Sequence, residues 1–218
     1  RTVFYWHIGA ALAWTAFIDL GPITLQFRSD FFDRIATFSA MSFGLTLGIW
    51  YTSLLLISVV NRSVPDTDPF QRFVRLNLGF IERWPAWLKL AAPLIGSVLC
   101  WIALAPLLAN LGVVPAAADV SRMLAQGAVL GIGSFLAWPY VIAAVLLFYV
   151  FHTYVYLGEM PFWKFITATG RNLLQPLAVL PLRLGKVDLA PVLMLGLIIA
   201  AARLLSSVIA ETYPRFQL

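Results

Sequence analysis

Charged residues are scarce in this chain. Only 11% of its 218 residues are Asp, Glu, Lys or Arg, whereas 61% are hydrophobic, and the mean hydropathy is +0.87. A soluble domain of this length needs more charge to cover its surface, so the composition indicates a protein solvated by lipid. The net charge of +5 is dispersed between apolar segments rather than gathered on one face, which argues against nucleic-acid binding.

Cysteine and catalytic motifs are nearly absent too. Cys100 stands alone, which excludes an internal disulfide and a zinc cluster, and its apolar surroundings predict a small buried side chain. The sequence has no Ser-His-Asp set, no paired carboxylates facing a pocket and no Gly-rich phosphate loop, so we expect neither an enzyme nor a metal site. Asp66 and Asp68 resemble a metal loop superficially, and a turn capping the following helix is the favoured interpretation.

Long apolar stretches are abundant instead. Five of them have the roughly 20 residues that a membrane-spanning helix needs. Since no stretch alternates with the period of a barrel strand, the predicted fold class is an all-α membrane protein. The first stretch contains Asp19, Gly21 and Pro22 and is interpreted as an extra N-terminal span, and Pro139 predicts a kink in the overlong fourth. The stretches are 3–27, 36–60, 90–111, 123–152 and 189–210.

Basic residues predict the orientation. Nine Lys and Arg residues lie in the loops after the second and fourth stretches, and four lie on the opposite side. Positive charge favours the cytoplasmic side, so we expect both long loops in the cytoplasm and the C-terminus outside it. The expected location is a bacterial inner membrane, either cytoplasmic or photosynthetic.

A short phrase occurs twice in the chain. "PFQRF" at 69–73 and "PFWKF" at 161–165 lie 92 residues apart, and Ser42-Phe43 falls on Ser134-Phe135 at the same offset. After a six-residue insertion, Pro93 falls on Pro191 at the expected heads of the third and fifth spans. These matches predict a tandem duplication. The predicted organisation is an extra N-terminal span at 1–35, a first unit at 36–111, a short connection at 112–122 and a second unit at 123–218.

The two phrases have helix period. Aromatic residues form one stripe, with Gln71, Arg72 and Glu82 opposite it in the first copy, and Pro69 and Pro161 suit a first helical turn. We expect two amphipathic helices in the headgroup plane, the alternative being ordinary loop helices packed on the bundle. The side chains expected at the membrane interface are Phe70, Phe73, Trp84, Trp87, Phe162, Trp163 and Phe165.

The second copy carries a recognisable motif. "PLRLGKVDLAP" at 181–191 resembles the YggT (YlmG) family of integral membrane proteins, with Pro181 and Arg183 in a turn and Asp188 before Pro191 at a helix start. Asp188 is similar to a helix N-cap. The resemblance implies two such units and a non-enzymatic membrane factor, linked to cell-envelope organisation or to assembly of energy-transducing complexes. The first copy, "WPAWLKLAAP" at 84–93, lacks the Arg turn and the Asp.

Four ionisable side chains in or near the spans carry hypotheses of their own. Asp19 and Arg203 have similar expected depth, so they are predicted to form an ion pair, the alternative being that each reaches the interface separately. His7 and His152 lie near the cytoplasmic ends of their spans and are candidate ligands for haem or a chlorin. Because the chain lacks a haem-attachment motif, interfacial hydrogen bonding is the favoured role, and no cofactor is expected.

Two small-residue motifs predict close helix packing. Gly44 and Gly48 lie four apart on the second span, and Gly127 and Gly131 lie four apart on the fourth. Glycines at this spacing let helices approach closely, so we expect these spans to pack against each other or against a partner helix.

The sequence has many aromatic and glycine residues suited to contact with helices or lipid and no catalytic motif, which favours a scaffold. The leading hypothesis is an assembly factor or accessory subunit docking on a larger respiratory or photosynthetic membrane complex, with lipids and other transmembrane helices as partners. A homo-oligomer remains an alternative, as do a channel or transporter and a haem- or chlorin-binding subunit.

Overall fold

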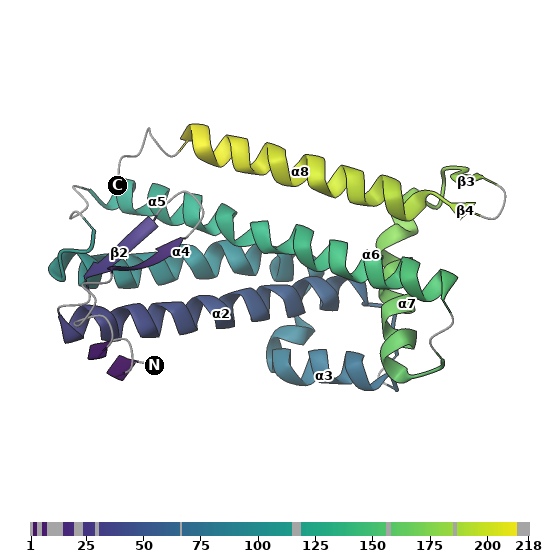
Figure 1. Ribbon diagram of the computed structural model, residues 1–218, viewed down its shortest axis with the longest axis horizontal. Helices are drawn as coiled ribbons and strands as arrows, with labels where there is room; N and C mark the ends of the chain where they lie inside the picture. The colour runs from purple at the N-terminus through teal and green to yellow at the C-terminus, as the bar shows by residue number, and fades with distance from the viewer. Residues whose placement is uncertain are drawn as a thin grey trace. The chain divides into compact units, whose positions relative to one another are not determined.

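The protein is described from a computed structural model (Figure 1). The structure describes residues 2–3, 6–7, 15–19, 24–28, 31–65, 67–114, 119–155, 158–184 and 187–212. Most of them are helical.

Four helical segments in the described part of the chain are long and apolar enough to cross a membrane. They correspond to the second to fifth predicted stretches and indicate an integral membrane protein. Each begins or ends within four residues of the predicted bounds, because uninterrupted apolar composition marks such helices directly in the sequence. They are α2 (Phe32–Val60), α4 (Ala86–Asn110), the segment Val120–Tyr154 and α8 (Ala190–Thr212).

The third of these segments is interrupted near its middle. It consists of α5 (Val120–Gly133), a 3₁₀ segment η2 (Ser134–Ala137) and α6 (Trp138–Tyr154). Pro139 is the second residue of α6, where its missing N–H costs little. The break therefore falls immediately before the proline from which a kink was predicted.

The expected helix over 3–27 is corrected by the structure. Strands β1 (Thr15–Asp19) and β2 (Thr24–Arg28) form an antiparallel pair in which Phe17 lies opposite Gln26. Ala16, Ile18, Leu25 and Phe27 are buried, whereas the residues between them are exposed, as expected of a two-residue strand period. The described residues thus contain four candidate spans, and Gly21 and Pro22, interpreted as a helix interruption, lie outside the described residues.

Short elements connect the spans. Between α2 and α4 lie α3 (Pro69–Leu78) and the 3₁₀ segment η1 (Gly79–Arg83), and between α6 and α8 lie α7 (Pro161–Leu174) and η3 (Gln175–Leu177). Figure 1 shows α7 running across the direction of α6. A small hairpin of β3 (Arg183–Leu184) and β4 (Val187–Asp188) precedes α8. We call residues 61–85 the first elbow and residues 155–189 the second elbow.

Local sequence explains the bounds of α3. Asp68 accepts hydrogen bonds from the backbone N–H groups of Phe70 and Gln71, which is the capping role favoured from the sequence. Pro69 occupies the first helical position. Gly79 ends the helix with a φ of 55°, a conformation that residues with a Cβ rarely adopt.

Two expectations about α4 are corrected. The helix begins at Ala86, so Pro93 lies in its interior rather than at its head, whereas Pro191 is the second residue of α8. Neighbouring structure in a membrane-spanning helix can compensate for the hydrogen bond that a proline removes. Cys100, expected to be buried, is exposed on α4 beside the exposed Leu99, because this part of the helix has no described neighbour covering it.

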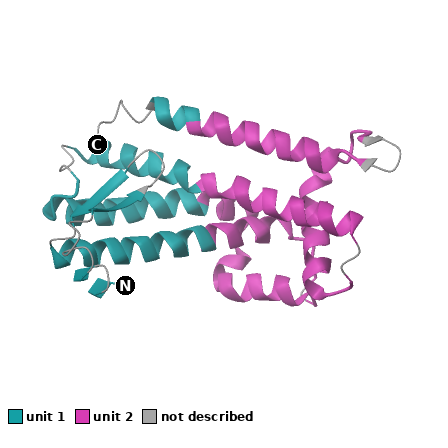
Figure 2. Cartoon of the chain, in the orientation of Figure 1, with its two compact units in different colours: residues 1–50, 92–134, 207–218 teal, residues 51–91, 135–206 magenta. Residues whose placement is uncertain are grey.

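The chain forms two compact units, coloured separately in Figure 2. Unit 1 comprises 1–50, 92–134 and 207–218, and unit 2 comprises 51–91 and 135–206. The core of unit 1 contains the buried strand residues with Phe38, Trp101 and Leu108, and the core of unit 2 contains Leu146, Leu173 and Leu174. Each long helix contributes to both units. The compact units therefore do not coincide with the predicted tandem units at 36–111 and 123–218, and the tandem duplication stays a prediction.

Candidate functional site

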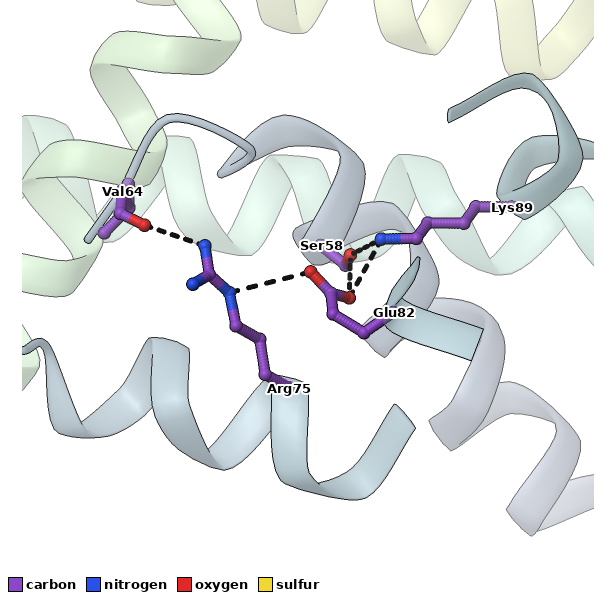
Figure 3. Close-up of polar contacts among 5 residues, drawn as sticks. All are labelled: Ser58, Val64, Arg75, Glu82 and Lys89. Carbon is purple, nitrogen blue, oxygen red and sulfur yellow. Dashed lines mark hydrogen bonds and ion pairs between the residues drawn. The ribbon is translucent and has the colours of Figure 1, made fainter. Parts of the chain in front are cut away.

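A buried polar network lies at the first elbow in unit 2 (Figure 3). The Lys89 ammonium lies 2.9 Å from Glu82 Oε2 and donates to Ser58 Oγ at 2.8 Å, and the Ser58 hydroxyl donates to the same carboxylate oxygen at 2.6 Å. On the other side of Glu82, Arg75 Nε lies 3.6 Å from Oε1, while Arg75 Nη2 donates to the Val64 carbonyl at 2.9 Å. We call Ser58, Arg75, Glu82 and Lys89 the elbow network.

Lys89 is unusual in this network because only 6% of it is exposed. Taking an ammonium group out of water is costly unless it is paired and hydrogen-bonded, and both contacts of Lys89 meet that need. Ser58 lies in the last turns of α2, Glu82 lies in η1, and Lys89 lies in the first turns of α4. The network therefore ties together both spans and the segment between them.

The elbow network borders a cavity of about 530 Å³. Arg72 and Arg83 are exposed on its wall, and Arg75 and Glu82 line it from the network side. The remaining lining residues are Leu76 and Gly79.

A second cavity, of about 560 Å³, lies at the second elbow. Its α7 residues are Lys164, Thr167, Ala168 and Arg171, and the α3 residues of the first cavity lie 92 positions before them. The two cavities thus occupy the same face of α3 and α7. Lys164 pairs with Glu159 at 3.4 Å, and both side chains are largely exposed.

The two repeated phrases contact each other. Phe70 of α3 lies 5.6 Å from both Phe162 and Phe165 of α7, measured between ring centroids, and stacks on Phe165. Phe148 of α6 approaches Phe162 and Trp163, each at 6.2 Å. Aromatic contact therefore joins both elbows within unit 2.

The expected aromatic and polar faces need correction at two positions. Phe165 is only 7% exposed and packs against Phe70, so its ring does not enter lipid. Gln71, placed on the polar face, is fully buried, and its amide N and O have no hydrogen-bond partner among the described residues. The buried residues of α3 are Gln71, Val74 and Leu78. The buried face of the helix is therefore rotated by about one residue from the face that the sequence pattern predicts.

The other predicted interface residues differ in exposure. Phe70, Phe73 and Trp87 are exposed, which fits a membrane-facing position. Trp84, Phe162 and Trp163 are half-buried; Trp84 contacts Phe80, and Trp163 contacts Phe162.

A buried hydrogen-bond chain links the end of α2 to α7. The Asn61 amide donates to Thr169 Oγ1 at 2.7 Å, and the Thr169 hydroxyl donates to the Phe165 carbonyl at 2.8 Å. The Asn172 amide donates to Asn61 Oδ1 at 3.1 Å. Asn61 and Thr169 are almost completely buried, so these hydrogen bonds fix α7 against the end of α2.

The histidines occupy different surroundings. His152 stacks on Trp163 with centroids 5.3 Å apart, its Nε2 lies 3.4 Å from the Gly158 carbonyl, and its Nδ1 lies 3.3 Å from Thr167 Oγ1. A metal would have to displace one of these contacts. His7 is exposed in unit 1 and touches Trp6 edge-on. In the described residues no group of three or more His, Cys, Asp or Glu side chains could hold a metal.

The predicted Asp19–Arg203 pair is left open. Asp19 ends β1 rather than lying in a helix, and its side chain is outside the described residues. Arg203 is exposed on α8, in the other unit.

The two glycine pairs are used differently. A Cβ added at Gly131 would lie 2.8 Å from Leu94 Cδ1 and one added at Gly127 3.2 Å from Val98 Cα, so α5 packs closely on α4. At Gly44 and Gly48 no atom of the described chain lies within 4 Å of such a Cβ. The predicted α5 packing is therefore made with α4 instead of α2, and the α2 pair is open.

The family-like motif begins α8. Asp188 Oδ1 accepts a hydrogen bond from the Ala190 N–H at 2.9 Å, and Pro191 follows in the first turn. Pro181 is exposed, and the Arg183 side chain lies outside what the structure describes.

Sequence reasoning missed Ser58, Glu82 and Lys89 as a group. Glu82 was assigned to a solvated helix face and Lys89 to the topology charges, since neither shows its partner in sequence. Ser58, a hydroxyl near the end of an apolar span, was the available signal. Comparison with family models, curated proteins and solved structures found no match.

Proposed function

We propose that the chain is a non-enzymatic integral membrane scaffold that docks on a larger membrane complex as an assembly factor or accessory subunit. The observation that carries the proposal is the open glycine pair on α2. Residues 43–48 are exposed on every face of the helix, and Gly44 and Gly48 have no described neighbour, whereas the matching pair on α5 is filled by α4. Small residues in a membrane-spanning helix favour close contact with another helix.

The same surface carries large apolar side chains. Phe43, Leu45 and Leu47 are exposed around the two glycines. Because lipid tails are as apolar as these side chains, packing against the glycine groove is what distinguishes a helix partner from lipid. That the complex is respiratory or photosynthetic, in a bacterial inner membrane, follows from the YggT resemblance, which rests on the motif at 181–191 alone.

Tandem duplication is part of the proposal. A span, a helix beginning at Pro69 or Pro161, a 3₁₀ segment and another span follow each other twice. The cavities beside α3 and α7 use positions 92 residues apart. Both elbows are then on one side of the membrane, which the charge bias assigns to the cytoplasm.

Gentle solubilisation from the native membrane tests the proposal. The scaffold predicts co-migration of the full chain with a larger complex on native gels. A haem or chlorin absorption band in the purified chain supports a cofactor-binding subunit instead, and a monodisperse colourless oligomer without partners supports a channel or transporter.

A further inference from the structure

The cavity at the first elbow is rich in arginine. Arg72, Arg75 and Arg83 line it with a single carboxylate, Glu82. Arg72 and Arg83 are exposed, and neither side chain forms a hydrogen bond or an ion pair within the described part of the chain. A volume of about 530 Å³ accommodates a phosphate and the group attached to it.

Glu82 offsets only part of this positive charge. Its Oε2 is occupied by the Lys89 ammonium and the Ser58 hydroxyl, and its Oε1 faces Arg75. The four basic side chains and one carboxylate of this cluster have a net charge of +3, with Arg75 held in place by the Val64 carbonyl. An anion entering the cavity therefore meets a fixed positive wall and two exposed guanidinium groups.

The chemistry of the wall favours phosphate. A guanidinium presents parallel N–H donors that match two phosphate oxygens, and it is more weakly hydrated than an ammonium. Apolar side chains adjoin the arginines: Leu76 lines the cavity and is 71% exposed, and Phe80 beside it is 71% exposed as well. A ligand with both a phosphate and an acyl chain uses both kinds of surface.

We propose that this cavity binds the phosphate of an anionic phospholipid, through Arg72 and Arg83 against the wall formed by Arg75. Its position supports a lipid source, because α3 and η1 connect two membrane-spanning helices and so lie at the edge of the membrane. The inference needs only the membrane location and not the scaffold proposal.

The second cavity is the internal comparison. It offers Lys164 and Arg171 with Glu159, which pairs with Lys164. Ala168 stands where the first cavity has Leu76. This cavity has less positive charge, so it binds an anionic lipid more weakly.

Lipid titration followed by native mass spectrometry tests the proposal. The full-length chain in a neutral detergent is titrated with phosphatidylglycerol or with phosphatidylcholine of the same acyl chains. Each arginine is expected to contribute about fivefold to the preference for the anionic lipid, so Arg72→Gln with Arg83→Gln lowers it about 25-fold. Arg62→Gln removes an equal charge from the same elbow outside the cavity and leaves the preference unchanged, and Lys164→Gln changes it less than the double variant.

Three results overturn the proposal. The first is equal affinity of the wild-type chain for both lipids, and the second is an unchanged preference in the double variant. The third concerns the source of the phosphate: competition by soluble glycerol phosphate at the concentration of the lipid assigns the site to free phosphates. Because both arginines are exposed, the double variant is expected to fold, and unchanged thermal unfolding verifies it.

Discussion

The first elbow and the second elbow both contain a proline-started helix followed by a 3₁₀ segment, to which the second adds strands β3 and β4, but different interactions hold them. In the first, charge is buried: Lys89, Glu82 and Ser58 join both spans. In the second, Leu173, Leu174 and Ala190 form an apolar core, and the ion pair between Lys164 and Glu159 is exposed. Two elbows with similar helices are thus stabilised in different ways, and only the first elbow depends on paired charges.

Removing the buried lysine breaks this comparison most strongly. Lys89→Met removes the buried partner of Glu82, which keeps only Arg75 and the Ser58 hydroxyl, so the free energy of unfolding is expected to fall by about 3 kcal/mol, the low end for a broken buried pair. Unfolding in detergent, followed by tryptophan fluorescence, measures it.

Lys164→Met is the matched control at the second elbow. Its pair is largely exposed, with side-chain exposures of 63% and 77%, so we expect a loss of only about 0–1 kcal/mol. Equal losses in the two variants contradict the distinction between the elbows.

The second elbow is expected to be sensitive to shape instead. A Cβ at Gly170 would lie 2.6 Å from the Tyr149 ring, so Gly170→Ala should reduce stability by about 1–3 kcal/mol through overpacking between α7 and α6. Gly196→Ala, on α8 with no neighbouring helix or side chain within 4 Å of the added Cβ, tests the methyl group without overpacking and should leave stability unchanged or raise it by up to about 1 kcal/mol, because alanine favours helix over glycine. A neutral Gly170→Ala variant refutes close α6–α7 packing.

Helix capping is expected to be equal in the two elbows. Asp68 caps α3, and the Asp188 carboxylate accepts from the first N–H of α8. Asp68→Ala and Asp188→Ala should each cost about 1 kcal/mol, because each leaves helix N–H groups without a partner. A cost at Asp188 several times that at Asp68 assigns the YggT-like motif a role beyond capping.

Sequence alone identified what depends on local composition. The spans, the proline-started helices and the Asp68 cap each need only a short window of residues. The β1–β2 hairpin was missed because its residues are apolar enough to continue the preceding stretch, so hydropathy outweighed the two-residue alternation.

The candidate site depends on contacts that no local window contains. Ser58 meets Glu82 across 24 positions and Lys89 across 31, and Asn61 meets Thr169 across 108. Gln71 shows that even the exposed face of a short helix is not fixed by the local sequence. Its polar side chain was expected to be exposed and is buried. Polar residues in nearly apolar chains are therefore better candidates for buried pairing than their sequence context indicates.

The most direct test of the scaffold function is to fill the open groove on α2. Gly44→Leu with Gly48→Leu is compared with Gly196→Leu, an equally open glycine on α8, by native gel migration from gently solubilised membranes. The account predicts that the double variant folds and reaches the membrane but migrates without the complex, while the control still co-migrates with it. Co-migration of the double variant with the complex at the wild-type level would contradict the account.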